Sequence, residues 1–507
     1  MICFVIIFLL FIIIPKTVIF LGIFQQNGYS SKKYLINLKT HYLKSISSYL
    51  EYISLGCLIT YYINYYWYVM VLVLFFLIGS FMLTKQLVLI PKLTKRLTRL
   101  LIVFIIINLL FFIYIKYILL VLLIETILIP LTILISSFIV LPVEKKIIKY
   151  YYNKTKTKLL KYSMINIGIT GSFGKTSTKN FLYHLIKDKY YTYKTPHSYN
   201  TPMGISKVVN NELLPVYEVF IAELGACNKG DIDELVSLVN IDIGVITEIG
   251  PQHLETFKSI DNVLKTKLEI LNSKNLKTLV INQDNIHLQN IKYPDNIEVI
   301  RVGINSKDYY HADNIVLSNS YLSFDFCYKE EVLINIKTKL LGYHNIYNLL
   351  ISIALAYKMG VSIKEIQEKC LTLEPVPHRL STRVDGNINI IDDSFNSNLV
   401  GFKNAVDVLK LSNDYKVIIT PGIVDGGKYL EELNTEVAFL LKEIDLVILV
   451  DNQSTTYIKN CLDKINYDKY IVVNSFKQAY NVAQKESKKR RITLLIENDL
   501  PDNYLRR

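Results

Sequence analysis

The chain has little cysteine, and its cysteines are scattered. Its 507 residues include six, at positions 3, 57, 227, 327, 370 and 461. No two of them form a CxxC pair, and none is grouped with histidine. Zinc sites and disulfide frameworks depend on such groupings, so we expect neither. Scattered cysteines also suit a reducing cytosolic compartment.

Acidic residues are almost absent from the first 150 positions. This part holds 3 Asp/Glu and 14 of the 57 Lys/Arg, so most of the net charge of +13 belongs to it. A basic chain can indicate nucleic-acid binding. Here, however, the basic residues are interspersed with long apolar segments, and the rest of the chain is nearly neutral. We therefore expect no nucleic-acid partner.

Charged residues are also absent from residues 1–14. This start lacks the basic region and the small-residue cleavage site of a signal peptide. Further apolar segments follow near 52–66, 67–83, 100–117 and 118–141. A helix needs about 17–25 residues to span a bilayer. We interpret residues 1–145 as a transmembrane helical domain of about five spans, the last four forming two hairpins. One long span in place of a hairpin would reduce the count to three or four.

Lysine and arginine gather between these segments. They occur in the loops 31–48 and 84–99 and again at 145–149. Cytoplasmic loops carry such an excess, and five spans place all three stretches on one side. The sequence therefore predicts a multi-pass protein of the cell membrane with its later domains in the cytoplasm. We interpret these charges as topological anchors, some of them near anionic membrane lipid.

The character of the chain changes after about residue 150. Short apolar runs occur at Met164–Thr170, Val219–Ala222, Ile243–Thr247 and Thr278–Ile281, and later at Ile388–Ile391, Lys416–Thr420 and Asp445–Val450. Helix-like segments separate them, a pattern typical of an α/β fold with a mostly parallel sheet. The sequence predicts a central domain over 150–374. It also predicts a Rossmann-like C-terminal domain over 375–507, without a dinucleotide fingerprint.

A phosphate-binding loop follows the first predicted strand. The segment Gly171–Thr176 reads GSFGKT, and a helix is expected to begin near Ser177. Its glycines allow backbone N–H groups to point at phosphate oxygens, and the helix N-terminus adds positive potential. Lys175 is placed to reach the outer phosphates, and the Thr176 hydroxyl can bind Mg²⁺. The strict GxxxxGK pattern is not met because Ile169 stands at its first glycine. A glycine-rich turn without a ligand is the alternative.

This loop resembles that of the Mur ligases, ATP-dependent amide-bond ligases that typically write it T-G-T-N-G-K-[TS]. Ser172 and Phe173 stand where Thr and Asn are usual. The resemblance implies a P-loop central domain that binds ATP through Thr170, Gly171, Ser172, Phe173, Gly174, Lys175, Thr176 and Ser177.

Two further stretches resemble the magnesium-binding segments of that family. Glu223 lies in a segment like E-[ML]-G, whose Glu binds magnesium. His253 matches the His of I-T-N-[IV]-G-x-x-H-L, which binds a second magnesium, and Glu248 replaces the Asn of that pattern. The resemblance therefore implies Mg²⁺ as a cofactor, held by Thr176, Glu223, His253 and Lys267.

Lys267 matches a lysine that most Mur ligases carbamylate. It lies in Phe257–Ile270, and Glu269 and Ile270 follow it in the family's register. Lys265 is two residues away and would face elsewhere on a helix. A carbamate is a carboxylate-like oxygen ligand that suits Mg²⁺. The resemblance implies catalytic roles for Lys175, Lys267 and His253, although a surface lysine is the alternative at 267.

The remaining matches concern the nucleotide and the substrate. Asn282 corresponds to an Asn near the adenine. Arg379 corresponds to an Arg that reaches the nucleotide when the C-terminal domain closes. The segment Asp392–Asn398 is close to D-D-S-Y-N-A-N of the MurF branch, which adds D-alanyl-D-alanine to a muramyl peptide. It implies nucleotide contact for Asp393 and substrate contact for Asn396 and Asn398, although an Asx turn role is as plausible for each alone.

The resemblance covers about residues 164–504 and implies a MurF-like ligase. In that family ATP converts a peptide carboxylate to an acyl phosphate, which an amine attacks. The expected partners are a UDP-linked or lipid-linked muramyl peptide from peptidoglycan synthesis and an amino acid or dipeptide. A poly-γ-glutamate synthase is an alternative that Asp392–Asn398 disfavours. An ATP-driven transporter or sensor would need a transmitter motif or spans lined with substrate-binding residues, and neither is seen.

Overall fold

The computed structural model describes residues 14, 16–39, 91–114, 118–252, 254–395, 398–424 and 427–498. The chain divides into two compact units at Lys149/Tyr150, and the second runs to Asp499. The predicted spans near 52–66 and 67–83, and nearly all of 1–14, lie outside the described residues.

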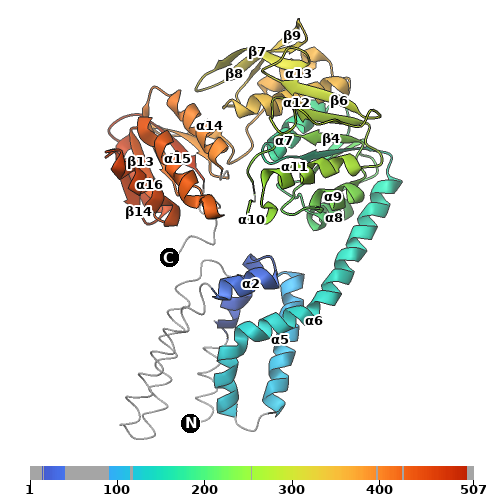
Figure 1. Cartoon of the computed structure of the whole chain (residues 1–507), viewed down its shortest axis with the longest axis vertical. Coiled ribbons are helices and arrows are strands. Elements are labelled where there is room, and N and C mark those ends of the chain that lie inside the picture. Colours follow the sequence, from blue (N-terminus) through green and yellow to red (C-terminus); the bar gives the residue numbers. More distant parts are fainter. Residues whose placement is uncertain are drawn as a thin grey trace. The chain divides into compact units, whose positions relative to one another are not determined.

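The described part of the first unit is helical (Figure 1). Its helices are residues 16–26, α2 (Ser31–Asn37), α5 (Lys95–Tyr114) and the first part of α6 (Ile118–Lys161). They enclose a small apolar core that includes Phe20, Phe24, Leu100 and Ile133. The Tyr34 ring lies fully buried edge-on against Phe24, with ring centroids 5.0 Å apart.

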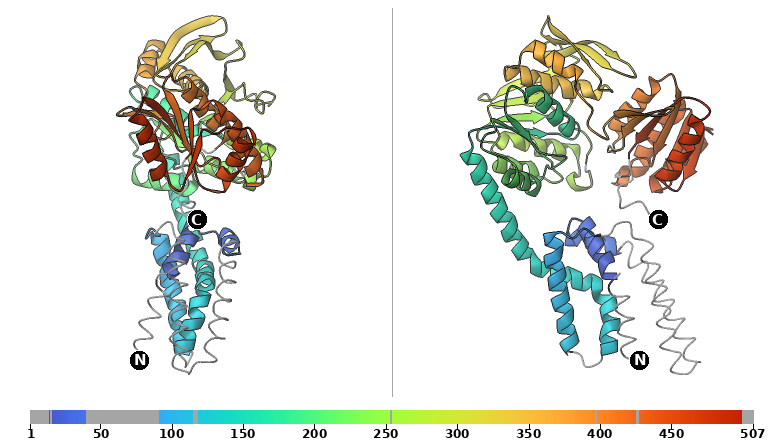
Figure 2. Two further views of the ribbon diagram at one scale, coloured as in Figure 1. Left: turned by 90° about the vertical axis from the view of Figure 1, so that its left-hand side faces the viewer. Right: turned by 180° about the vertical axis from the view of Figure 1, so that it is seen from behind.

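Helix α6 differs from the predicted last span. The prediction ended that span near 141, but the helix continues to Lys161, so the lysines at 145–149 lie on the helix and not in a loop after it. No glycine or proline interrupts residues 143–161. Pro130 and Pro142 lie inside the helix, which bends along its course (Figure 2), as prolines cause. In the described part of the chain, one helix, Leu128–Lys161, is long and apolar enough to cross a bilayer.

Apolar side chains are exposed on both long helices of this unit. On α5 they are Ile102, Ile105, Ile106, Leu109 and Leu110, and on α6 they include Leu131, Ile135, Phe138 and Ile139. Arg99 Nε lies 2.5 Å from Glu144 Oε1, so the start of α5 lies beside this part of α6. The basic residues at 92–99 and 145–149 therefore gather toward one end of the helix pair, with the apolar surface beyond them.

The second unit begins with the central domain. Its elements are β1 (Ile165–Thr170), α7 (Lys175–Ile186), β2 (Thr192–Lys194), α8 (Pro202–Asn211), β3 (Val219–Glu223), α9 (Asp231–Val239), β4 (Ile243–Ile246), α10 (Leu254–Phe257), α11 (Ile260–Leu268), the short 3₁₀ helix η2 (Glu269–Asn272), β5 (Thr278–Asn282), β6 (Glu298–Gly303), β7 (Tyr310–Leu317), β8 (Leu322–Tyr328), β9 (Glu331–Thr338), α12 (His344–Lys358) and α13 (Ile363–Leu371).

The central sheet has the order β2-β3-β1-β4-β5-β6-β7-β8-β9. Strands from β2 to β7 are parallel, which confirms the predicted mostly parallel sheet, whereas β8 and β9 add an antiparallel end that the sequence analysis did not predict. Side chains alternate between the two faces of a strand. Val219 and Ile221 of β3 enter one core beside α7 and α12, while Phe220 and Ala222 enter another beside α8 and α9. Burial on both faces explains why these strands read as continuous apolar runs.

The C-terminal domain is built on a second sheet. Its elements are β10 (Ser381–Asp385), β11 (Ile388–Asp393), α14 (Leu399–Lys410), β12 (Tyr415–Thr420), η3 (Gly427–Tyr429), α15 (Leu430–Leu440), η4 (Leu441–Glu443), β13 (Leu446–Val450), α16 (Gln453–Lys464), β14 (Tyr470–Val473), α17 (Phe476–Ser487) and β15 (Ile492–Glu497). The order is β10-β11-β15-β12-β13-β14, parallel except for β10. The predicted Rossmann-like sheet is present.

Candidate functional site

The phosphate loop connects β1 to α7 and needs both of its glycines. Gly171 has φ 147° and Gly174 has φ 80°, backbone conformations that side chains disfavour. A Cβ at Gly171 would lie 2.1 Å from Thr247 Oγ1, and one at Gly174 would lie 2.3 Å from Asn348 Oδ1. Both torsion angle and space therefore exclude larger residues. Helix α7 begins at Lys175, two residues before the predicted start.

The loop is fixed to the end of the neighbouring strand β4. Ser172 N donates to Glu248 O at 2.6 Å, and Ser172 Oγ donates to Gly250 O at 3.0 Å. The Thr247 hydroxyl contacts the Thr170 and Phe173 carbonyl groups. Lys175 Nζ folds back onto two loop carbonyl groups, at 2.7 Å from Gly171 O. Burial lowers the Lys175 pKa to about 8.

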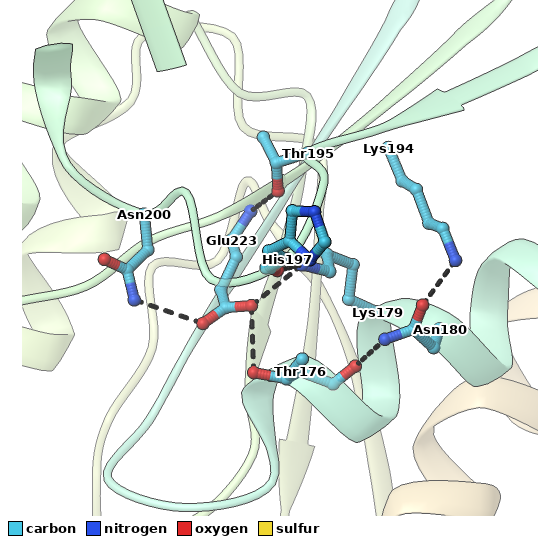
Figure 3. A network of polar contacts seen from close by, with 8 residues as sticks. All are labelled: Thr176, Lys179, Asn180, Lys194, Thr195, His197, Asn200 and Glu223. Carbon is cyan, nitrogen blue, oxygen red and sulfur yellow. Dashed lines mark hydrogen bonds and ion pairs between the residues drawn. The ribbon is translucent and has the colours of Figure 1, made fainter. Parts of the chain in front are cut away.

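Glu223 is the centre of a buried polar network (Figure 3). It is the last residue of β3, and its side chain is 1% exposed. Its Oε2 accepts from Thr176 Oγ1 and from Lys179 Nζ, each at 3.0 Å, and its Oε1 accepts from Asn200 Nδ2 at 3.2 Å. The predicted ligand pair Thr176 and Glu223 thus lies in direct contact across β3 and α7.

Lys179 is a part of this network that the motif analysis missed. It lies one helical turn after Lys175 and is 1% exposed. Its Nζ also donates to the carbonyl oxygen of His197, a residue with φ 45°. Burial raises the pKa of Glu223, but the charges of Lys179 and Lys175 outweigh it and hold that pKa below its usual value. Its i+4 spacing from Lys175 was visible in the sequence, but its partner was not.

Lys267 lies on the buried face of α11. Its side chain is 1% exposed, and among the described residues its Nζ has no hydrogen-bond partner. Burial, and then the charge of Lys175, lower its pKa to about 7. Lys265 on the same helix is exposed, as the predicted facing requires. A buried lysine whose amine has no hydrogen-bond partner among the described residues is unusual, and the surface alternative is wrong.

Glu248 connects the phosphate loop with the end of β5. Its Oε2 accepts from Asn282 Nδ2 at 2.7 Å, and its Oε1 accepts from Asn285 Nδ2 at 2.6 Å. Its backbone oxygen holds Ser172 N. Burial raises the pKa of Glu248, and the two amides offset part of that effect. Glu248 was an unexplained departure from the family pattern in the sequence. In the structure it orients Asn282, the residue predicted to lie near the adenine.

The C-terminal candidates lie near the start of the second sheet, between the end of α13 and the start of α14. Asp393, at the end of β11, accepts from Leu380 N at 3.1 Å. The Arg379 guanidinium lies 4.8 Å from the centre of the Phe395 ring. Asn398 Oδ1 accepts from Gly401 N at 2.8 Å and caps α14, the local role weighed against substrate contact.

Two predicted residues are not placed. His253 and Asn396 lie outside the described residues. Among the residues that the structure does describe, no three His, Cys, Asp or Glu side chains form a group able to hold a metal ion. The predicted ligand set therefore depends on Thr176 and Lys267 as well as on Glu223.

Glu497 is a fully buried carboxyl group that the motifs did not mark. It ends β15 directly beside Asp393 in the parallel ladder. Neither of its carboxylate oxygens has a standard hydrogen-bond partner among the described residues. Burial and the neighbouring Asp393 raise the Glu497 pKa well above its usual value, and burial raises that of Asp393 to about 6.

Replacing Glu248 by Gln should weaken nucleotide binding. A Gln amide can accept from only one of the two Asn side chains and turns its own donors toward the other. Losing one hydrogen bond to a charged group costs about 1.5–3 kcal/mol, or at least about ten-fold in affinity. Calorimetric titration with ADP measures the effect. The exposed Glu330→Gln should bind like the unsubstituted chain, and equal affinity in E248Q would contradict the assigned role.

Replacing Glu497 by Gln should stabilise the protein at high pH. Because the folded pKa of Glu497 is raised, the native state holds a proton that the unfolded state releases above about pH 4.3. Stability is then lost as pH rises, by about 1.4 kcal/mol per unit while the native carboxyl stays protonated. Urea unfolding at pH 5, 6.5 and 8 should show a gain for E497Q that grows with pH. The exposed Glu432→Gln should show none, and a pH-independent E497Q effect would refute the buried-proton account.

Comparison with known proteins relates this site to a family. Residues 169–356 match the Mur ligase middle domain. The UDP-N-acetylmuramoyl-tripeptide–D-alanyl-D-alanine ligase of Borreliella burgdorferi is 32% identical over 271 residues, covering 51% of this chain and 56% of that protein. The Escherichia coli ligase of the same name is 28% identical over 295 residues, covering 57% and 65%. The chain thus spans less than two thirds of the length of these relatives.

Solved structures share the fold. The MurF ligase of Thermotoga maritima, in complex with ADP, has a TM-score of 0.63 at 23% identity and covers 69% of this chain and 80% of that one. A pseudomurein peptide ligase type C of Methanothermus fervidus has a TM-score of 0.53 at 19% identity, covering 67% and 77%. The matched middle domain carries the phosphate loop, Glu223 and Lys267. The chain therefore contains a Mur ligase middle domain over residues 169–356.

Proposed function

We propose that the protein is an ATP-dependent ligase of peptidoglycan precursor synthesis that adds D-alanyl-D-alanine, or a similar amine, to a muramyl peptide. One observation carries this proposal: a single domain holds the phosphate loop, Glu223 in contact with Thr176 of that loop, and the buried Lys267 amine without a hydrogen-bond partner among the described residues. The names of the relatives support the MurF-type substrate. The first 150 residues lie outside the middle-domain match, so that match does not define the acceptor.

The described residues fit a Mg²⁺ site. Magnesium is usually held by one or two carboxylates together with substrate phosphates. Thr176 Oγ1 and the Glu223 carboxylate, 3.0 Å apart and next to the loop, are suitable oxygen donors for one ion. Bound Mg²⁺ would supply charge neutralisation on the phosphates of ATP. We assign His253 and a modified Lys267 to a second ion.

Lys267 fits the carbamate role. Carbon dioxide adds to a neutral amine, and the product is a carbamate and a released proton. The Lys267 amine has the lowered pKa that this addition needs. Its Nζ has no hydrogen-bond partner among the described residues, so formation of the carbamate would break no existing hydrogen bond. Lys175 makes the largest charge contribution to that pKa after burial. A negative carbamate would therefore be attracted to a cation already present.

The chain's own residues would position the reactants. The loop N–H groups and Lys175 hold the outer phosphates of ATP while its γ-phosphoryl group passes to the acceptor carboxylate, giving an acyl phosphate and ADP. The amine then attacks the acyl carbon, phosphate leaves, and the amide bond is formed. Such catalysis rests on positioning and charge stabilisation. We assign Arg379 and Asp393 to nucleotide contact from the C-terminal side and Asn396 and Asn398 to the incoming amine.

We further propose that residues 1–145 attach this ligase to a membrane, with the catalytic domains in the cytoplasm. The exposed apolar faces of α5 and α6 suit a lipid environment, and the lysines and arginines at one end of the helix pair suit its cytoplasmic side. Attachment would bring the enzyme close to a lipid-linked acceptor.

The product formed from defined substrates tests the activity. Purified full-length protein in detergent is given ATP, Mg²⁺ and D-alanyl-D-alanine with UDP-linked or lipid-linked muramyl tripeptide, and the products are weighed by mass spectrometry. We expect an acceptor heavier by one dipeptide less one water, with phosphate released in equal amount. Exclusive use of the UDP-linked acceptor would remove the lipid-linked proposal. ATP turnover that no amine or acceptor changes would refute the ligase and favour a transporter or sensor.

Replacing Lys267 by Ala should lower ligation by at least about 100-fold, because a metal-binding group and its charge are lost. Acetate or formate should restore part of the activity by filling the space of the missing carbamate. Lys265→Ala, on the exposed side of the same helix, is the matched control and should remain active. Labelling with ¹³C-bicarbonate should give a carbamate carbon signal in the unsubstituted chain and none in K267A. Full activity of K267A without added acid would refute the assignment.

A further inference from the structure

Lys179 is a buried cation at the position where a metal ion is proposed. Its Nζ lies 3.0 Å from Glu223 Oε2, the same oxygen that Thr176 Oγ1 contacts. Both members of the pair are 1% exposed, so water screens their attraction little. Figure 3 shows the lysine reaching this carboxylate from α7, behind the His197 loop. The carboxylate therefore already has a counter-ion in the folded chain.

The local charge is unfavourable for a free divalent cation. Of the described side chains at this site, Glu223 contributes a negative charge, while Lys175, Lys179 and Arg379 contribute positive ones. Such positive charges near a buried carboxylate oppose the entry of a further cation much more strongly than they would in water. The phosphates of ATP would reverse that balance, because they add several negative charges beside Lys175. The site becomes attractive to Mg²⁺ when phosphate is present.

The lysine also orders the surroundings of Glu223. Its Nζ donates to the carbonyl oxygen of His197, and Asn200, three residues later, donates to the other oxygen of Glu223. Thr195 Oγ1 accepts from Glu223 N at 3.1 Å. The segment 195–200 is thus attached to Glu223 at three points: to its backbone N–H, to its carboxylate directly, and to its carboxylate through Lys179. Glu223 is held in one position without a metal ion.

We propose that Lys179 takes the place of the divalent cation beside Glu223 until nucleotide arrives, so that Mg²⁺ enters as its complex with ATP and not as the free ion. This inference rests on the proposed ATP and Mg²⁺ site. Lys179 is a positioning residue, because its Nζ bonds to Glu223 and to the carbonyl oxygen of His197. It holds the carboxylate in position, and it disfavours a metal ion bound without substrate.

Binding of Mn²⁺ alone tests this inference, because no acceptor or amine is needed. The full-length protein in detergent is titrated with Mn²⁺, and the unbound ion is measured by electron paramagnetic resonance, with and without a non-hydrolysable ATP analogue. We expect Lys179→Met to bind Mn²⁺ alone at least about ten-fold more tightly than the unsubstituted chain. With the analogue present, the two should differ much less. Lys179→Gln, which retains a donor for His197 O, should show the same change if K179M does not fold.

Lys194→Met is the matched control. Lys194 lies in the same network but donates to Asn180 Oδ1, and no bond joins it to Glu223 (Figure 3). K194M should bind Mn²⁺ like the unsubstituted chain. Equal affinity for Mn²⁺ alone in the unsubstituted chain and both Lys179 variants would overturn the inference. An equal gain in K194M would overturn it as well, since the effect would then be general charge. Neither outcome depends on ligation, which the product assay measures separately.

Discussion

The buried Glu223 carboxylate is the constraint on which the rest of the site depends. A carboxylate that is 1% exposed is tolerated only when charges and donors surround it. Here three donors reach the carboxylate, Thr176 and Lys179 from α7 and Asn200 from the loop after β2, while Thr195 Oγ1 accepts from the backbone N–H of Glu223. Removing one partner of such a pair costs about 3–5 kcal/mol. The network thus joins the phosphate loop, the metal position and the 195–200 segment in one cooperative unit.

The parallel sheet brings these groups together. The carboxyl ends of β1, β3, β4 and β5 lie at one edge, because the strands are parallel and neighbours in the sheet. The phosphate loop, Glu223, Glu248 and Asn282 each stand at one of these ends. Ligands of open α/β sheets bind at this edge. Glu248 then connects the loop at the end of β1 with Asn282 at the end of β5, so that the loop and the nucleotide-side amides are held by one residue.

The phosphate loop was predictable from the sequence because its chemistry is local. A strand, two glycines, a lysine and a helix start lie within a dozen residues, and each has a physical reason at its position. The strands were predictable for a similar reason, since burial on both faces makes them continuous apolar runs.

Lys179, Glu248 and Glu497 were not predictable as partners. Each gains its role from a residue 34 to 104 positions away, or from a neighbouring strand, and such pairing depends on the sheet order. The antiparallel β8 and β9 were missed because their alternation was not recognised. The continuation of α6 past 141 was not predictable, because the composition changes there from apolar to polar while the helix continues to Lys161.

The two lysines of α7 have opposite tasks although they are four residues apart. Lys175 Nζ contacts loop carbonyl oxygens, which are weak partners that phosphate oxygens can replace. Lys179 Nζ is committed to a carboxylate and a carbonyl oxygen inside the protein and has no exposed surface to offer a ligand. One turn of helix therefore separates a cation that is available to substrate from a cation that is used for structure. Both lysines act on Glu223. Under the proposed order of binding, the charge that nucleotide brings to Lys175 would also decide whether the carboxylate beside Lys179 accepts a metal ion. That order would follow from electrostatics, without a moving part.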